Sequence, residues 1–188
     1  MYFNEDLQGI AWIDVESTGL SPYLTGDKLL QVACYVTDTD LNILEPQGFE
    51  AFVHYTPEET RELYDNTSEY VQNMHNSTGL WEKLSTEGIP LSSIDAQLKE
   101  YISSFYPDKK TVWFGGNSIV LDRNFVTAFL PETDAFLHYR NVDVTSVAGL
   151  ALSWYGFSFE KKRSHNAKED IMESIEELRA LRKVVFKQ

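Results

Sequence analysis

The stretch IAWIDVESTGL, residues 10–20, joins a short apolar run to two carboxylates that are separated by a single residue. Residues 10–13 include Trp and Ile and are typical of a strand. Because side chains alternate between the two faces of a strand, Asp14 and Glu16 should project from the same face. Two like charges side by side disfavour each other's ionised form, and a divalent cation removes that penalty because it prefers oxygen ligands. An exposed strand end that carries two acids is the alternative interpretation of this stretch alone.

The chain around this stretch predicts a mixed α/β domain. Two more apolar runs follow closely, so the first three strands should form an antiparallel meander. In chain order, the strands are expected over about 10–13, 28–36, 43–55, 111–116 and 137–144. The helices are expected over about 56–73, 92–105, 120–130, 144–155 and 166–185. This order, without repeats or a linker, predicts one domain over residues 1–188.

Several helix boundaries carry specific signals. Thr56 can cap the first helix, Pro57 suits its first position and Glu59 completes a capping box. Pro131 should end the helix that precedes it. Asn166 is expected to cap the last helix.

Composition narrows the class of protein. The net charge of −13 argues against broad, non-specific binding to nucleic acid, and the only basic run is Lys161, Lys162 and Arg163. No apolar run approaches the roughly 20 residues of a membrane span, and the acidic N-terminus is unlike a secretory signal. Cys34, the single cysteine, lies in the apolar run LLQVACYV and should be buried. A reducing compartment, the cytoplasm, is therefore expected.

Further acids extend the pair in the first strand. Asp122 lies at the start of the helix after the fourth strand, and Asp170 lies in the first turn of the last helix. Each acid alone is explained by the helix dipole. His165 lies five residues before Asp170, and its ordinary pKa near neutrality suits a general base. A surface histidine is the alternative for His165 alone, so the whole set carries the argument.

Four segments together resemble one family. They are IAWIDVESTGL, GNSIVLDRNF, LHYRNVDV and SHNAKEDIMESIEEL, at residues 10–20, 116–125, 137–144 and 164–178. In this order they resemble the motifs of the oligoribonuclease family, within the DEDDh (DnaQ-like) 3′-to-5′ exonuclease superfamily. The resemblance implies an RNase H-like fold, which is a mixed five-stranded sheet flanked by helices. It also implies a 3′-to-5′ exoribonuclease that acts on short RNA, especially dinucleotides, and releases nucleoside 5′-monophosphates.

The same resemblance implies roles for individual residues. The implied ligands of two Mg²⁺ or Mn²⁺ ions are Asp14, Glu16, Asp122 and Asp170, and the implied general base is His165. Leu20 matches a leucine that inserts between two bases, although a turn residue packed inward is its alternative. The other implied substrate contacts are the base platform Tyr70, the phosphate-binding His75 and Ser118, and Tyr139 and Arg140 from the partner of a homodimer.

Some features depart from the family pattern. Gln31 occupies a position where the family often has Glu, and the SPYLTGDK segment, residues 21–28, is about two residues longer than usual. Both lie near expected substrate contacts, so a DEDDh exonuclease that acts on DNA or longer oligonucleotides is the first alternative. A non-catalytic nucleic-acid-binding subunit with the same fold is the second. The complete set of acids and His165 argues against the second alternative.

Overall fold

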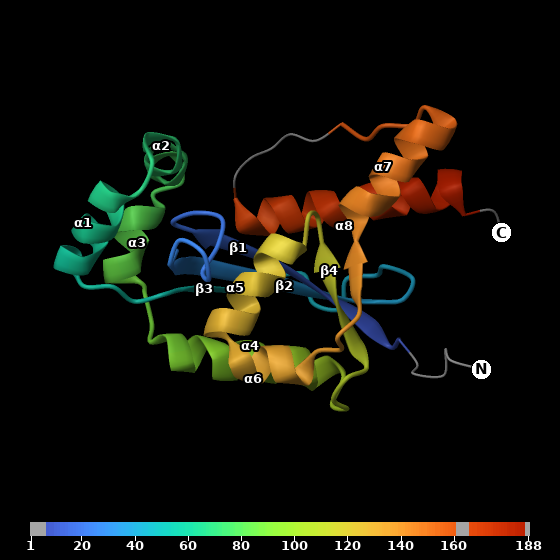
Figure 1. Ribbon diagram of the computed structural model, residues 1–188. Helices are drawn as coiled ribbons and strands as arrows, with labels where there is room; N and C mark the ends of the chain where they lie inside the picture. The colour runs from blue at the N-terminus through green and yellow to red at the C-terminus, as the bar shows by residue number, and fades with distance from the viewer. Residues whose placement is uncertain (1–6, 161–165, 187–188) are drawn as a thin grey trace.

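A computed structural model describes residues 7–160 and 166–186 and contains one five-stranded sheet (Figure 1). The strand order is β3-β2-β1-β4-β5. The strands are β1 (Gly9–Ser17), β2 (Leu29–Asp38), β3 (Phe49–Phe52), β4 (Val112–Gly116) and β5 (Asn141–Asp143). β1, β2 and β3 pair antiparallel, as the meander predicts, whereas β1–β4 and β4–β5 pair parallel. The mixed five-stranded sheet is therefore confirmed.

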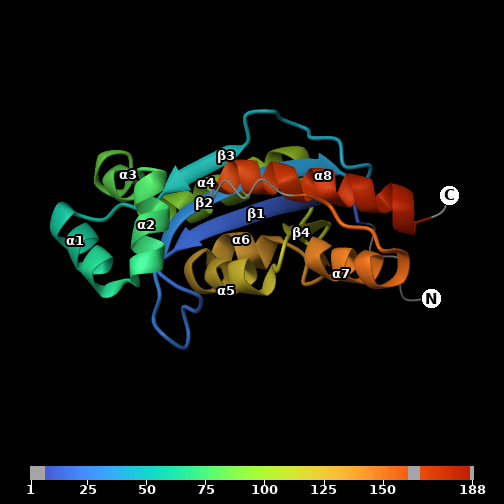
Figure 2. The same cartoon turned by 90° about the horizontal axis from the view of Figure 1, so that it is seen from above.

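Helices cover both faces of the sheet (Figures 1 and 2). They are α1 (Pro57–Asn66), α2 (Glu69–Ser77), α3 (Leu80–Thr86), α4 (Leu91–Phe105), α5 (Val120–Phe129), α6 (Pro131–Phe136), α7 (Val144–Tyr155) and α8 (Ala167–Val185). α4, α5 and α6 share one hydrophobic core with the sheet, and α7 and α8 share another on the opposite face. The short helices α1 to α3 lie at one end of the sheet, where Leu80, Trp81 and Leu84 form a third cluster.

The central strand β1 connects these layers. Side chains along β1 alternate between the two faces of the sheet. Ala11, Ile13 and Val15 lie in the core beneath α4 and α5. Ile10 and Trp12 lie in the core beneath α7 and α8. The same period of two places Asp14 and Glu16 on the α8 face. The fold therefore points both acids toward the first turn of α8.

The helices at the end of the sheet differ from the prediction. The capping box of Thr56 and Glu59 is confirmed, but the helix expected over 56–73 is two helices. The backbone is extended at Thr67, and the Ser68 hydroxyl accepts the Val71 N–H to start α2. α3 has no counterpart among the expected helices.

Pro131 also has a second role beyond ending a helix. α5 ends before it as predicted, but Pro131 then occupies the first turn of α6, a position that needs no N–H donor. The buried Asp95 carboxylate of α4 accepts the backbone N–H groups of Glu132 and Thr133, each at 2.8 Å. These bonds satisfy the exposed donors of this helix start and fix α6 against α4.

Other sequence predictions are confirmed directly. Gly156 ends α7 in the left-handed conformation, and Asn166 caps α8 by accepting the Glu169 N–H. Cys34 is a free, buried thiol whose pKa is raised by burial. Within residues 7–160 and 166–186, no helix is long and apolar enough to cross a membrane.

Candidate active site

Three acids meet at one end of the sheet. Asp14 and Glu16 come from β1, and Asp170 comes from the first turn of α8. One carboxylate oxygen from each of the three lies within 4.8 Å of the others. Oxygen-rich clusters of this kind suit hard divalent cations. Strand alternation and the cap of α8 together produce this convergence.

Asp122 approaches the cluster from the opposite layer. β1 pairs with β4 only as far as Trp12, so the backbone of β1 is open to a side chain beyond that point. The buried Asp122 of α5 fills this place, and its Oδ1 accepts the Val15 N–H at 3.1 Å. Its charge acts on Glu16, so all four acids that the sequence singled out lie in one neighbourhood.

The electrostatics of the cluster favour a cation. Burial, and after it repulsion by Asp170 and Asp122, raises the pKa of Glu16 to about 8. Burial raises the pKa of Asp122 to about 7, although the backbone N–H of Val15 opposes that rise. Carboxylates in this state resist ionisation until positive charge is supplied, so the donor set fits a divalent ion.

His75 lies against this cluster in the interior. Its side chain is 1 % exposed, and its Nε2 donates to the backbone oxygen of Ser17 at 2.9 Å. Its Nδ1 lies 3.8 Å from Glu16 Oε2, and its ring packs edge-on against Trp81. In this conformation His75 touches a predicted metal ligand, and the predicted phosphate contact of His75 stays a prediction.

Gln31 lies opposite Glu16 in the register of β1 and β2. Its side-chain amide donates to Glu50 Oε1 at 2.8 Å, and Lys168 Nζ lies 3.7 Å from the same Glu50 carboxylate. With Gln instead of Glu at position 31, no further carboxylate lies directly beside Glu16. The departure from the family pattern therefore lowers the negative charge next to the cluster.

A pocket of about 780 Å³ opens beside the acids. Its lining includes Glu16, Leu20 and Leu121, together with Tyr70 and Met74 of α2. The side chains of Leu20 and Tyr70 are 77 % and 70 % exposed, so both are accessible for contact with a base. An apolar pocket that borders a group of acids is the arrangement expected for a small, charged and partly aromatic ligand.

Ser118 lies on the loop between β4 and α5. It has a positive φ of 51°, and its N–H donates to Asp143 Oδ1 and Thr145 Oγ1 at 3.1 and 2.9 Å. Asp143 also caps α7 through the Thr145 N–H, which explains this acid without a metal. Ser118 is exposed, and its predicted phosphate contact stays a prediction.

Tyr139 and Arg140 lie on the surface near β5. Tyr139 stacks on His138 with ring centroids 4.3 Å apart, and the Arg140 guanidinium lies over the rings of Tyr139 and Trp113. Neither residue is among those that line the pocket in the described chain. A role in this site would therefore have to come from a second copy, as the resemblance implies.

Polar residues behind the acids were not predicted. The amide of Asn117 donates to Ser174 Oγ at 2.8 Å and to Glu177 Oε2 at 3.2 Å, and Ser174 Oγ donates to the Asp170 backbone oxygen at 2.8 Å. These contacts fix α8 to the end of β4. Ser174 and Glu177 follow Asp170 at intervals of four and three residues, so helical spacing is the signal that could have revealed them.

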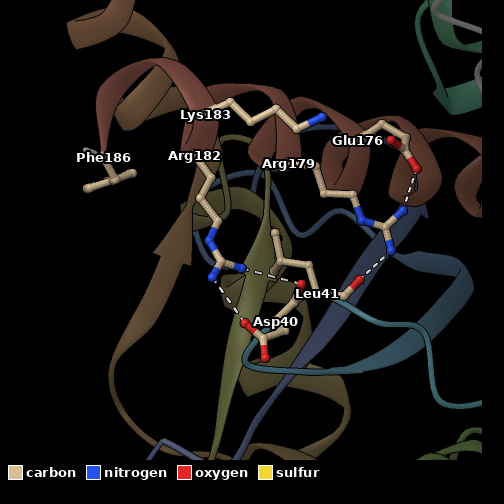
Figure 3. Close-up of a pocket in the computed structure, with 7 residues that line it drawn as sticks. All are labelled: Asp40, Leu41, Glu176, Arg179, Arg182, Lys183 and Phe186. Atoms are coloured by element: carbon tan, nitrogen blue, oxygen red, sulfur yellow. Dashed lines mark hydrogen bonds and ion pairs between the residues drawn. The ribbon is translucent and has the colours of Figure 1, made fainter. Parts of the chain in front are cut away.

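A second hollow, of about 770 Å³, lies at the other end of α8 (Figure 3). Arg182 Nη2 donates to Asp40 Oδ1 at 3.0 Å, and the Arg179 guanidinium donates to the backbone oxygen of Leu41. These bonds fasten the turn after β2 to α8. Because its arginines are already engaged, we assign this hollow a structural role.

Part of the predicted site lies outside the described residues. His165, the predicted general base, and the basic run Lys161, Lys162 and Arg163 belong to the segment that the structure does not describe. Their predicted roles stay predictions.

Comparisons with known proteins agree with this geometry. The Exonuclease (RNase T) family matches residues 11–178. The oligoribonucleases of Leifsonia xyli and Cutibacterium acnes are 38 % and 37 % identical over 181 residues, which cover 94 % of this chain and 84 % and 86 % of theirs. The oligoribonuclease of Neisseria meningitidis is 34 % identical and covers 95 % of this chain and 92 % of its own.

Solved structures show the same fold. Exonuclease I of Methylocaldum szegediense superposes with a TM-score of 0.70 at 15 % identity, over 96 % of this chain and 41 % of that chain. E. coli exonuclease I in complex with a dA16 oligonucleotide superposes with a TM-score of 0.68 at 13 % identity, over 95 % and 41 %. The chain thus spans less than half of these exonucleases, and they support the RNase H-like architecture alone. From the family match over residues 11–178 and the identity to its curated relatives, the chain belongs to the oligoribonuclease family of the DEDDh exonuclease superfamily.

Proposed function

We propose that this chain acts, as one domain, as a metal-dependent 3′-to-5′ exoribonuclease that degrades short oligoribonucleotides to nucleoside 5′-monophosphates. The observation that carries the proposal is the convergence of Asp14, Glu16 and Asp170 within 4.8 Å, with Asp122 beside them, at the edge of an apolar pocket. Family membership supports the same activity. The cytoplasm stays the predicted compartment.

The acids would hold two divalent ions, Mg²⁺ or Mn²⁺. When bound, such ions lower the pKa of water and stabilise negative charge on a phosphate and its leaving oxygen. Asp14, Glu16 and Asp170 supply oxygens from two elements, and the hydrogen bond from Val15 fixes the orientation of Asp122. His165 would accept the proton of the attacking water on an imidazole nitrogen.

The pocket supports the proposed preference for the shortest substrates. Leu20 would insert between two bases while Tyr70 stacks on one, and base–aromatic stacking stabilises binding by about 1–3 kcal/mol per base. A dinucleotide carries few phosphates, so a protein of net charge −13 needs no basic groove to bind it. A processive enzyme on long chains would need such a groove.

Hydrolysis of labelled oligomers of two to about seven nucleotides, as RNA and as DNA with Mn²⁺, tests the proposal. Fast loss of the diribonucleotide and slow loss of longer chains is the expected result. Comparable cleavage at every length, or of DNA, would move the chain to another branch of the DEDDh exonucleases. Absence of metal-dependent cleavage would favour the non-catalytic binding subunit.

We also propose that two copies of the chain form a homodimer. Tyr139 and the α7 residues Leu150, Leu152, Trp154 and Tyr155 are exposed, and within α7 only Val144 and Ala151 are buried. A helix with apolar residues on most of its sides is normally covered. A second copy would cover this surface and bring Tyr139 and Arg140 to the partner's pocket.

Arg140→Ala should raise the KM for a diribonucleotide and leave the fold intact, because Arg140 would contact the substrate phosphate bound to the partner. Exposed Arg61→Ala is the matched control. Mixing Arg140→Ala with Asp14→Asn under subunit exchange should restore roughly one quarter of the wild-type sites, because one site of each mixed dimer has both groups intact. An unchanged KM in Arg140→Ala, or no restoration on mixing, would contradict shared sites.

A further inference from the structure

The loop between β1 and β2, residues 18–28, is a closed and internally bonded structure. Figure 2 shows it projecting beyond the end of β1. Its two ends are joined because the Thr18 N–H donates to the Lys28 oxygen at 3.0 Å and the Lys28 N–H donates to Thr18 Oγ1 at 2.9 Å. The 18–28 loop therefore leaves and rejoins the sheet at one fixed place.

Asp27 organises the interior of the 18–28 loop. Its carboxylate accepts the Ser21 N–H at 3.0 Å and the hydroxyl of Thr25. A side chain at Gly19 would collide with this carboxylate, since an added Cβ would overlap Asp27 Oδ1. Gly26 supplies a positive φ of 73° at the turn. The conformation of the tip is thus specified by bonds within the loop.

Leu24 lies at that tip and faces the pocket. Its N–H donates to Ser21 Oγ at 3.1 Å, which fixes its backbone, yet its side chain is 89 % exposed. Leu24 lines the same pocket as Leu20, Tyr70 and Glu16. A single exposed leucine is ordinary, but a leucine on a bonded loop at the rim of the substrate pocket is placed for contact.

We infer that Leu24 is a substrate-binding residue that covers a nucleobase of the bound oligoribonucleotide, an inference that rests on the proposed function. The 18–28 loop and α2 contribute separate parts of the pocket lining, so a base between them would meet Leu24 from one element and Tyr70 from the other. The contact is apolar and reads no hydrogen-bond pattern, so it strengthens binding of any base. Because the loop is pre-organised, little ordering is needed on binding.

Steady-state cleavage of diribonucleotides by Leu24→Ser tests this inference. The KM should rise about threefold to tenfold with kcat unchanged, because the lost contact is made equally in the ground state and the transition state. Leu24→Met should retain a KM near that of the wild type. Tyr23→Ser is the matched control, since Tyr23 is exposed on the same loop and is not among the described residues that line the pocket.

Each outcome distinguishes the inference from the proposed function. A raised KM in Leu24→Ser alone supports a role for this side chain. An unchanged KM, an equal change in Tyr23→Ser, or a fall in kcat alone overturns the role of Leu24 while wild-type cleavage upholds the proposed function. If the wild type itself cleaves no oligoribonucleotide, the proposed function fails and this inference fails with it.

Discussion

Asp14→Asn should lower Mn²⁺-dependent cleavage of a diribonucleotide by at least roughly 100-fold, while the protein remains folded. Loss of a residue that only supports a metal ligand costs about 10–100-fold, so loss of a direct ligand should exceed that range. Asparagine keeps the shape of the side chain and removes its charge. Asp14 is only partly buried and belongs to none of the three hydrophobic clusters, so the melting temperature should change little.

Two measurements and a control variant separate metal binding from other causes in Asp14→Asn. The loss should appear in kcat, and the Mn²⁺ concentration for half-maximal activity should rise. Asp108→Asn is the matched control, because Asp108 is an exposed acid in the connection between α4 and β4. Activity of Asp14→Asn near that of the wild type would remove this carboxylate from the proposed metal site.

Local sequence signals predicted those parts of the fold that local bonds determine. The capping box at Thr56 and the cap at Asn166 are examples, since each signal acts within four residues. The break at Thr67 was missed because the apolar and polar pattern continues across it, while the Ser68 cap decides it. Pro131 was interpreted only as an end, although proline also suits the first turn of a helix.

In the candidate site, too, local sequence signals predicted some features, whereas contacts between distant segments were missed. Strand alternation alone predicted that Asp14 and Glu16 share a face. The partnership of Asp122 with the Val15 N–H depends on where the pairing of β1 and β4 ends, and that point is set by tertiary structure. The burial of His75 against Glu16 likewise depends on how α2 and α3 pack at the end of the sheet. Such contacts between distant segments have no periodic signal in the sequence.

Glu16→Gln should stabilise the metal-free protein at pH 8 while it abolishes activity. In the folded protein burial and the charges of Asp170 and Asp122 raise the pKa of Glu16 to about 8, from an ordinary value of 4.5. A raised acid pKa means that the folded state binds the proton more tightly, so its contribution to stability is complete below pH 4.5 and is lost as the pH rises toward 8. Glutamine has no proton to lose, so its advantage should grow across that window.

The expected gain of Glu16→Gln over the wild type at pH 8 is on the order of 2–4 kcal/mol, or about 5–10 °C in melting temperature, and it should be small at pH 5. Exposed Glu100→Gln, in α4, is the matched control for the loss of one negative charge. Mn²⁺ should raise the melting temperature of the wild type and have little effect on Glu16→Gln, because the bound ion would supply the missing positive charge. A Glu16→Gln variant less stable than the wild type at pH 8 without metal would contradict a destabilising carboxylate at this position. The assignment of Glu16 as a metal ligand because its charge destabilises the metal-free protein would then fail. This comparison therefore tests the metal site without any substrate.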